Sequence, residues 1–177
     1  MIRTFAAAWL SLLLLGLMAG CATVTPQDYA RESPKLDLKT YFNGKVDGWG
    51  MVQDRSGKVL RRMVVEMECT WNGDEGVLDE SFRWSDGKTE KRVWKIRKQG
   101  DRYIGTAGDV VGEAQGEAAG NALQWRYVLR LPEDVGGYEM NMDDWMWMVD
   151  DKTLTNRTSM SKLGVKFAEI TIFFRKR

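Results

Sequence analysis

The sequence contains no histidine, and it has only two cysteines and three prolines among its 177 residues. Without histidine, the usual zinc sites and every nucleophile that a histidine would activate are excluded. An excess of one charge is also missing: 26 basic and 25 acidic side chains nearly cancel, unlike the basic balance of nucleic-acid-binding proteins. We therefore expect no catalytic residue of these kinds, no metal ion, no cofactor and no nucleic-acid partner.

Long hydrophobic runs are scarce as well, and the one that stands out extends from Phe5 to Met18. The run follows Arg3 and precedes Ala19, Gly20 and Cys21. A transmembrane helix needs about 20 apolar residues, so this run is too short to span a bilayer comfortably. A basic start, an apolar run and small residues, in this order, predict a secretory signal peptide over residues 1–20.

The motif Met18-Ala19-Gly20-Cys21 resembles the bacterial lipobox, in which an aliphatic residue and two small residues precede a cysteine. The resemblance implies that Cys21 becomes the mature N-terminus and carries acyl chains such as palmitate. Each buried acyl CH₂ contributes about 0.8 kcal/mol to membrane binding, so two or more chains anchor a protein stably. Ala22 stands where an aspartate would retain a lipoprotein in the inner membrane, which implies the periplasmic face of the outer membrane. The alternative is an ordinary secretory signal that ends near a cysteine.

If Cys21 is acylated, Cys69 has no partner in the chain and no intrachain disulfide can form. Free cysteine is among the most buried residue types. We therefore expect Cys69 to be a small buried hydrophobe rather than a nucleophile.

The rest of the chain divides into a tether and one domain. Residues 21–36 contain prolines among scattered polar residues and show no apolar period, so we expect a lipidated tether. Residues 37–177 are expected to form a single domain with a core of its own. Short alternating segments within it are separated by Gly, Asn and Asp turns, which is typical of antiparallel hairpins.

We expect an all-β domain of ten strands, at residues 45–55, 59–71, 77–84, 88–98, 102–107, 110–117, 122–131, 138–148, 153–161 and 165–175. Their even spacing predicts a barrel or a sandwich, and the hairpin-after-hairpin order favours an antiparallel up-and-down barrel. Small residues share one face of 112–118, which leaves room for the rings of Trp125 and Tyr127 in the next strand. The last strand is apolar on both faces, so we expect the tether or a short helix near 36–42 to cover its outer side.

Aromatic and methionine side chains are abundant in this domain. Seven of the eight tryptophans lie beyond residue 20, and four methionines alternate between residues 140 and 148. These side chains either fill a core or line a pocket for an acyl chain or another flat apolar ligand, for which Trp94, Trp125 and Tyr127 are candidates. The acidic pairs Asp143-Asp144 and Asp150-Asp151 are expected to be solvated.

The register of one hairpin predicts two charges inside the barrel. A three-residue loop at 85–87 pairs Phe82 with Glu90 and Glu80 with Arg92, which keeps the apolar face continuous. Because an unpaired buried charge is costly, we predict a Glu80–Arg92 ion pair; the alternative is a twist or bulge that turns one of them outward. Arg92 is then the first candidate, and Arg157 the second, to meet the carboxylate of an acyl ligand.

Several short motifs occur through the domain, among them Tyr41-Phe42-x-Gly44, Gly48-Trp49-Gly50, Glu80-x-Phe82, Trp94-x-Ile96, Asp109-Val110-Val111-Gly112, Asp144-Trp145-Met146 and Asn156-Arg157. Together they resemble an uncharacterised bacterial lipoprotein family, domain of unknown function 3833. The resemblance implies no activity. The expected fold also resembles the calycins, the lipocalin and fatty-acid-binding group, in which a tryptophan and an arginine close one barrel end. Gly48-Trp49 and Arg175 are the matching residues here.

Three functions remain open. The first is a membrane-anchored, periplasm-facing module that binds an apolar or acyl ligand in envelope lipid handling. The second is a structural or interaction lipoprotein with a filled core. The third, an enzyme that uses carboxylates, would need an inward acid with a raised pKa at a cavity. The anchor, the barrel and the aromatic interior favour the first.

Overall fold

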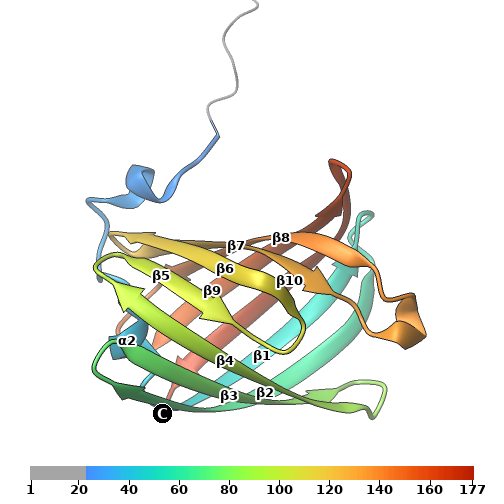
Figure 1. Cartoon of the computed structure of the whole chain (residues 1–177), viewed down its shortest axis with the longest axis horizontal. Coiled ribbons are helices and arrows are strands. Elements are labelled where there is room, and N and C mark those ends of the chain that lie inside the picture. Colours follow the sequence, from blue (N-terminus) through green and yellow to red (C-terminus); the bar gives the residue numbers. More distant parts are fainter. Residues whose placement is uncertain (1–22) are drawn as a thin grey trace, which may run out of the picture.

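The computed structural model describes residues 23–177, and Figure 1 shows a closed antiparallel β-barrel. Around the barrel the strand order is β1-β10-β9-β8-β7-β6-β5-β4-β3-β2. The strands are β1 (Gly44–Asp54), β2 (Val59–Asn72), β3 (Glu75–Trp84), β4 (Thr89–Gln99), β5 (Arg102–Thr106), β6 (Val110–Ala119), β7 (Ala122–Arg130), β8 (Glu139–Met148), β9 (Thr153–Lys162) and β10 (Val165–Lys176). The expected all-β class and up-and-down order are confirmed. The predicted signal peptide and Cys21 lie outside the described residues.

Buried and exposed side chains alternate along the strands, as expected, and the buried ones form the interior. In β2, Met63, Val65, Met67 and Cys69 are buried and the residues between them are more exposed. In β6, Gly116 lies opposite Trp125 of β7, and a Cβ at this glycine would approach the indole to 2.9 Å. The small residues of β6 therefore provide the room for the large rings of β7.

The hairpin between β3 and β4 has the predicted register. Leu78 lies opposite Trp94, Glu80 opposite Arg92, and Phe82 opposite Glu90. Gly87 adopts a φ of +84°, the left-handed conformation that a three-residue loop of this kind requires. Glu80 and Arg92 therefore both point into the barrel.

The segment expected to be a tether lies against the barrel wall. The short 3₁₀ helix η2 (Pro26–Tyr29) contacts β6 and β7, and the Tyr29 ring lies 6.0 Å from that of Trp145. Farther along, the Leu36 amide donates a hydrogen bond of 2.8 Å to the carbonyl of Gly120. Residues 26–36 thus fix the point at which the chain leaves the barrel.

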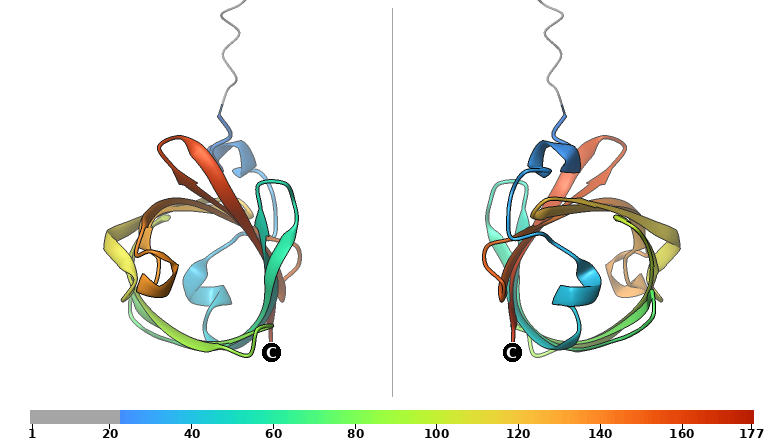
Figure 2. Two further views of the ribbon diagram at one scale, coloured as in Figure 1. Left: turned by 90° about the vertical axis from the view of Figure 1, so that its right-hand side faces the viewer. Right: turned by 90° about the vertical axis from the view of Figure 1, so that its left-hand side faces the viewer.

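The helix α2 (Leu38–Tyr41) lies inside one end of the barrel, as both views in Figure 2 show. The Asp37 side chain caps it by accepting a hydrogen bond from the Thr40 amide. Leu36, Leu38 and Phe42 are at most 2% exposed. The expectation that this segment covers the outside of the last strand is therefore wrong: its apolar side chains find a drier environment inside the barrel. Within residues 23–177, no helix is long and apolar enough to cross a membrane.

The outer face of β10 stays open to solvent instead. Phe167 and Phe173 are about half exposed, and so is Trp49, which lies opposite Phe173 on β1. Arg175 also points outward and contacts the Thr153 hydroxyl. The expected closure of the barrel end by Trp49 and Arg175 is therefore wrong, because α2 occupies the end of the barrel.

Candidate ligand-binding site

A cavity of about 130 Å³ lies inside the barrel, bounded at one end by Leu38 and Phe42 of the α2 segment. Its walls are mostly apolar, and aromatic rings from four strands contribute to them: Phe82, Trp84, Trp94, Trp125, Tyr127 and Phe174. Trp94 stacks on Trp125 at 6.0 Å and meets the Tyr127 ring edge-on at 5.5 Å. Trp94, Trp125 and Tyr127, the aromatic candidates from the sequence, all lie along this cavity. An engineered cavity of about 150 Å³ in another protein holds benzene, so this space suits a molecule of about one ring.

One side of the cavity carries Arg92, whose guanidinium is already hydrogen-bonded within the protein. The Arg92 guanidinium donates two hydrogen bonds to Asp109 Oδ2, from Nε at 3.0 Å and from Nη2 at 2.5 Å. Its carbon centre also lies 5.9 Å from the ring of Phe82. Burial lowers the Arg92 pKa, but the carboxylates of Glu80 and Asp109 outweigh this effect and raise it above its ordinary value. Arg92 is therefore positively charged and paired.

The predicted Glu80–Arg92 ion pair is wrong, although both side chains point inward. Asp109, in the loop before β6, forms the ion pair with the Arg92 guanidinium in place of Glu80. Glu80 lines the cavity at 8% exposure, and no group among the described residues donates a hydrogen bond to its carboxylate. Burial raises the pKa of Glu80 to about 7, an effect that the charge of Arg92 partly offsets.

The other side of the cavity holds a second polar group built around Asp144. Its carboxylate accepts hydrogen bonds from the Asn156 amide and, at 3.4 Å, from the Tyr127 hydroxyl. Asn156 also donates to the backbone carbonyl of Trp145 at 3.0 Å, which fixes its amide. Burial raises the pKa of Asp144 to about 6 despite these hydrogen bonds, and it raises the pKa of Tyr127 well above the usual value.

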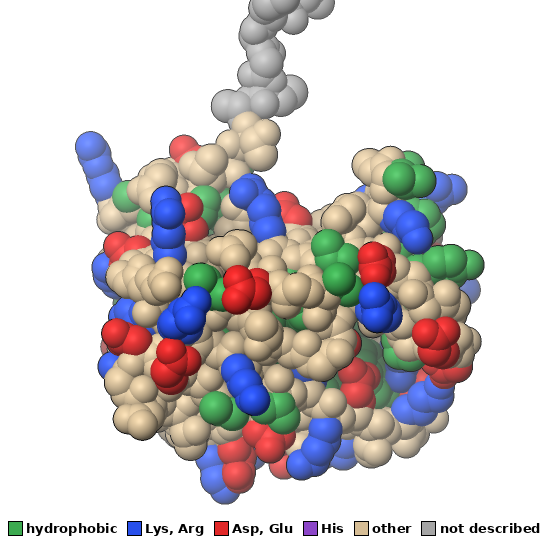
Figure 3. Space-filling view, in the orientation of Figure 1, with side chains coloured by type: hydrophobic (Ala, Val, Ile, Leu, Met, Phe, Trp, Pro, Cys, Tyr) green, Lys and Arg blue, Asp and Glu red, His purple; other side chains and the backbone are tan. Residues whose placement is uncertain are grey.

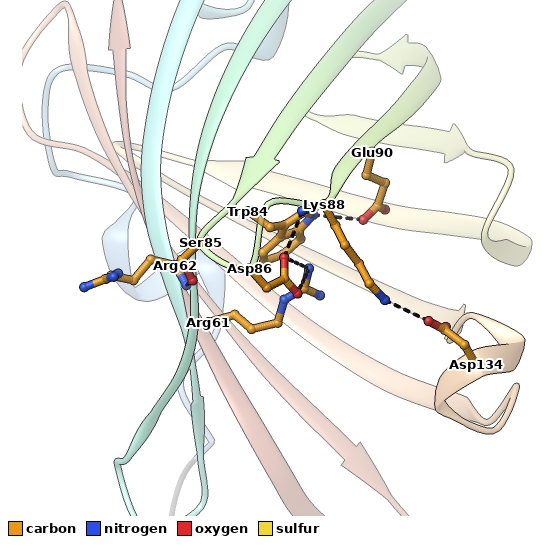
Figure 4. A network of polar contacts seen from close by, with 8 residues as sticks. All are labelled: Arg61, Arg62, Trp84, Ser85, Asp86, Lys88, Glu90 and Asp134. Carbon is orange, nitrogen blue, oxygen red and sulfur yellow. Dashed lines mark hydrogen bonds and ion pairs between the residues drawn. The ribbon is translucent and has the colours of Figure 1, made fainter.

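A network of polar contacts lies at the barrel end opposite α2 (Figure 4). Lys88, in the β3–β4 loop, forms an ion pair of 2.9 Å with Asp134 in the short 3₁₀ helix η3 (Glu133–Val135). Arg61 lies 4.0 Å above the Trp84 ring, whose Nε1 donates to Glu90. These contacts tie the β3–β4 loop to its neighbours, and most of the side chains are exposed. Solvated ion pairs lie at the rim of this end, whereas apolar side chains of the α2 segment pack inside the other end.

One sequence candidate, Arg157, does not belong to the cavity. Arg157 lies on the outer face of β9, where its side chain is 62% exposed and pairs with Glu169 at 2.5 Å. Its neighbours Asn156 and Thr158 point inward, so strand alternation alone places Arg157 outside. Cys69 is buried as expected, and burial raises the pKa of its thiol to about 12. A thiol with such a pKa is a poor nucleophile.

Sequence reasoning missed Asp109, Asp144 and Asn156. The expectation that Asp144 is solvated is wrong, because it is 8% exposed, whereas its neighbour Asp143 points outward to Arg126. A signal for this position existed: Asp144 shares its parity with the four methionines of β8. Asp109 precedes β6 in a loop, where no alternation indicates direction.

Fold and site together define a calycin-like barrel with an interior cavity lined largely by aromatic and other apolar side chains. The chain belongs to the family described as "Protein of unknown function (DUF3833)", which matches residues 15–176. This match confirms the resemblance inferred from the short motifs.

Two solved structures share the barrel. One is a protein of unknown function from the DUF3598 family of Nostoc punctiforme, with a TM-score of 0.56 and 11% identity over 82% of this chain and 51% of the other. The chain thus spans about half the length of the Nostoc protein. The second is an S-type phycobiliprotein lyase from Guillardia theta, with a TM-score of 0.54 and 5% identity over 80% of this chain and 94% of the other. A comparison with curated proteins finds no match. At these identities the likeness concerns the fold alone.

Proposed function

We propose that this protein is a lipoprotein of the outer membrane whose barrel binds a small apolar molecule on the periplasmic side, in the handling of envelope lipids or lipid-like compounds. The observation that carries the binding role is the cavity inside the barrel, in which aromatic walls surround a few inward polar groups. Such a combination is typical of small-molecule sites, and small β-barrels are common containers for them. In a core with a structural role alone, a buried carboxylate such as that of Glu80 is expected to have a hydrogen-bond donor.

The size of the cavity restricts the ligand. About 130 Å³ accommodates one ring or a short chain, and a long acyl chain would require side chains to move. Met63, Met67 and Met146 line the cavity, and methionine has the flexibility to make such room. We therefore propose a ring-sized apolar ligand rather than a full fatty acid.

Native mass spectrometry of the protein extracted from its own membranes tests the binding role. We expect an additional mass of a few hundred daltons or less, which dissociates when the barrel unfolds. Substituting Trp94→Ala enlarges the cavity and removes a stacking partner, so the same mass should be lost or replaced. A protein that carries no mass, and that takes up no apolar probe after purification, would contradict the proposed function.

The proposed anchoring gains support from the side on which the barrel exposes apolar groups. The β9–β10 and β1–β2 hairpins project in the same direction as the described start of the chain (Figures 1 and 2). They lie side by side, because Asp54 of β1 pairs with Ala168 of β10. Leu163 is 92% exposed at one tip and Leu60 is 55% exposed near the other. Hydrophobic and basic side chains occur together on this projection (Figure 3). Apolar tips with basic neighbours suit the interface of a membrane that has anionic headgroups.

Substituting Cys21→Ser tests the anchor. The variant should accumulate as an uncleaved precursor without acyl chains, because the serine hydroxyl does not replace the thiol in lipid attachment. Metabolic labelling with an alkyne fatty acid measures the result. Cys69→Ser is the matched control and should label like the wild type. Equal labelling of the Cys21→Ser variant would exclude the proposed anchor.

A second candidate function rests on the inward acids. Glu80 and Asp144 line the cavity with pKa values of about 7 and 6, the range in which a carboxyl group exchanges protons near neutral pH. A carboxylate-dependent enzyme would convert the molecule that it binds, whereas a binding protein would release it unchanged. The chemical identity of the bound mass before and after incubation therefore distinguishes the two.

A further inference from the structure

The interior of the barrel is electronegative. Glu80, Asp109 and Asp144 face one cationic side chain, Arg92, and Glu90 adds a fourth carboxylate at the cavity wall. Arg92 is already engaged by two hydrogen bonds to Asp109. A ligand carboxylate would have to displace Asp109 and would meet Glu80 at once. The sequence-based expectation that Arg92 holds the carboxylate of an acyl ligand is therefore not supported by this arrangement.

Two acceptors in this cluster have no donor among the described residues. The carboxylate of Glu80 lies in a side chain that is 8% exposed and faces the cavity. Asp109 Oδ1 is buried and has no hydrogen-bond partner, because both bonds from Arg92 go to the other oxygen. Ionised carboxylates accept hydrogen bonds and cannot donate them. Asp109 is not among the residues that line the cavity, so the Glu80 carboxylate is the acceptor that a ligand can reach, and a positively charged donor satisfies it best.

The aromatic walls favour a cation as well. Trp94, Trp125 and Phe82 present their rings to the cavity, and the faces of such rings attract positive charge at up to about 6 Å. In contrast, the polar group around Asp144 needs no donor from a ligand, since Asn156 and Tyr127 already donate hydrogen bonds to Asp144. The demand for a donor from a ligand is thus concentrated at Glu80.

We propose that the cavity selects a ring-sized apolar molecule with a protonated amine, which donates hydrogen bonds to Glu80 while its ring lies among Trp94, Trp125 and Tyr127. This inference rests on the proposed binding function and specifies the class of ligand. It predicts an order of affinity for molecules that share one apolar part: cation first, neutral alcohol second, carboxylate last.

Three probes with the same phenylethyl group test this order: 2-phenylethylamine, 2-phenylethanol and 3-phenylpropionate. Binding to the purified protein at pH 7.5 is measured by isothermal titration and by the change in tryptophan fluorescence. We expect the amine to bind about tenfold more tightly than the alcohol, which is the gain of one charge-assisted hydrogen bond over a neutral one. The carboxylate should bind most weakly, because Glu80 and Asp109 repel it.

Substituting Glu80→Gln should lower the affinity for the amine more than the affinity for the alcohol, so that the preference for the amine is lost. Glu66→Gln is the matched control, since Glu66 lies on the outer face of β2 and pairs with Arg83. It should preserve the order of affinities.

The possible results separate the two proposals. If the alcohol or the carboxylate binds as tightly as the amine, the cavity binds ligands but the inferred class is overturned. If none of the three probes binds, the proposed function itself is overturned, and the inference with it. The comparison of probes on the wild-type protein decides the matter even if the Glu80→Gln variant does not fold.

Discussion

Substituting Arg92→Met is expected to lower the free energy of unfolding by about 1–3 kcal/mol, less than the cost of breaking a fully buried pair, because the Arg92 and Asp109 side chains are 21% and 29% exposed. The substitution keeps the apolar stem and removes the two hydrogen bonds to Asp109. Asp109 and Glu80 then lose the cation whose charge acts on both of them. Urea unfolding followed by tryptophan fluorescence measures the loss.

A second substitution should restore part of this loss. Asp109→Asn removes the unpaired charge, so the double variant should be more stable than the sum of the single effects predicts. Arg157→Met is the matched control, because its ion pair with Glu169 lies on the outer face and contributes about 0–1 kcal/mol at most. Additive losses, or equal losses for the two arginines, would show that the interior pair has no special role.

The pH dependence of this loss follows from the two acids with raised pKa. Glu80 titrates at about 7 and Asp144 at about 6 in the folded protein, well above their ordinary values of 4.5 and 3.8. The folded state keeps protons that the unfolded chain releases, so the stability from these groups is full below pH 4 and is lost as the pH rises through 7. Arg92 lowers both pKa values. Its removal should therefore cost more at pH 8 than at pH 5.

Substituting Phe42→Ala should cost about 3–5 kcal/mol of unfolding free energy, as for other fully buried rings. Phe42 is 2% exposed, and its ring meets those of Tyr41 at 4.9 Å and Phe174 at 5.7 Å. Its loss would also join the cavity to the α2 end of the barrel. We therefore expect faster exchange of a bound apolar probe in stopped-flow measurements, together with a lower unfolding midpoint in urea.

Phe173→Ala is the control for this substitution, since the same residue type is 52% exposed on the outside of β10. Its effect on stability should stay below about 1 kcal/mol, and probe exchange should not change. A similar loss at both positions would contradict the description of α2 as an interior plug.

The sequence alone predicted the strands and the register of the β3–β4 hairpin, because both depend on the local alternation of inward and outward side chains. The bulged loop at 85–87 determines which face Glu80 and Arg92 share, and the structure has the same pairs. Parity likewise places Trp94, Trp125 and Tyr127 in the interior. Each of these conclusions needed only neighbouring residues.

The ion-pair and hydrogen-bond partners inside the barrel come from residues that are far apart in the sequence, so local patterns did not predict them. Asp109 reaches Arg92 from a loop, and loop side chains have no fixed alternation. The α2 segment is apolar whether it covers a strand from outside or enters the barrel, so its composition did not distinguish the two positions. Arg157 is different, because its outward direction followed from the same alternation that placed its neighbours inside.

The pairing of β1 with β10 determines when this protein can complete its folding. Val46 lies opposite Lys176, so the ring of hydrogen bonds closes only after the last strand has emerged and met the first. Each hairpin forms from neighbouring residues, but this final contact carries the loop-closure entropy of nearly the whole domain. Until that moment, the backbone groups at both edges are free to pair with another chain. The slowest and most aggregation-prone step should therefore be the last, and a chain delivered unfolded across a membrane would pass through it only on the far side.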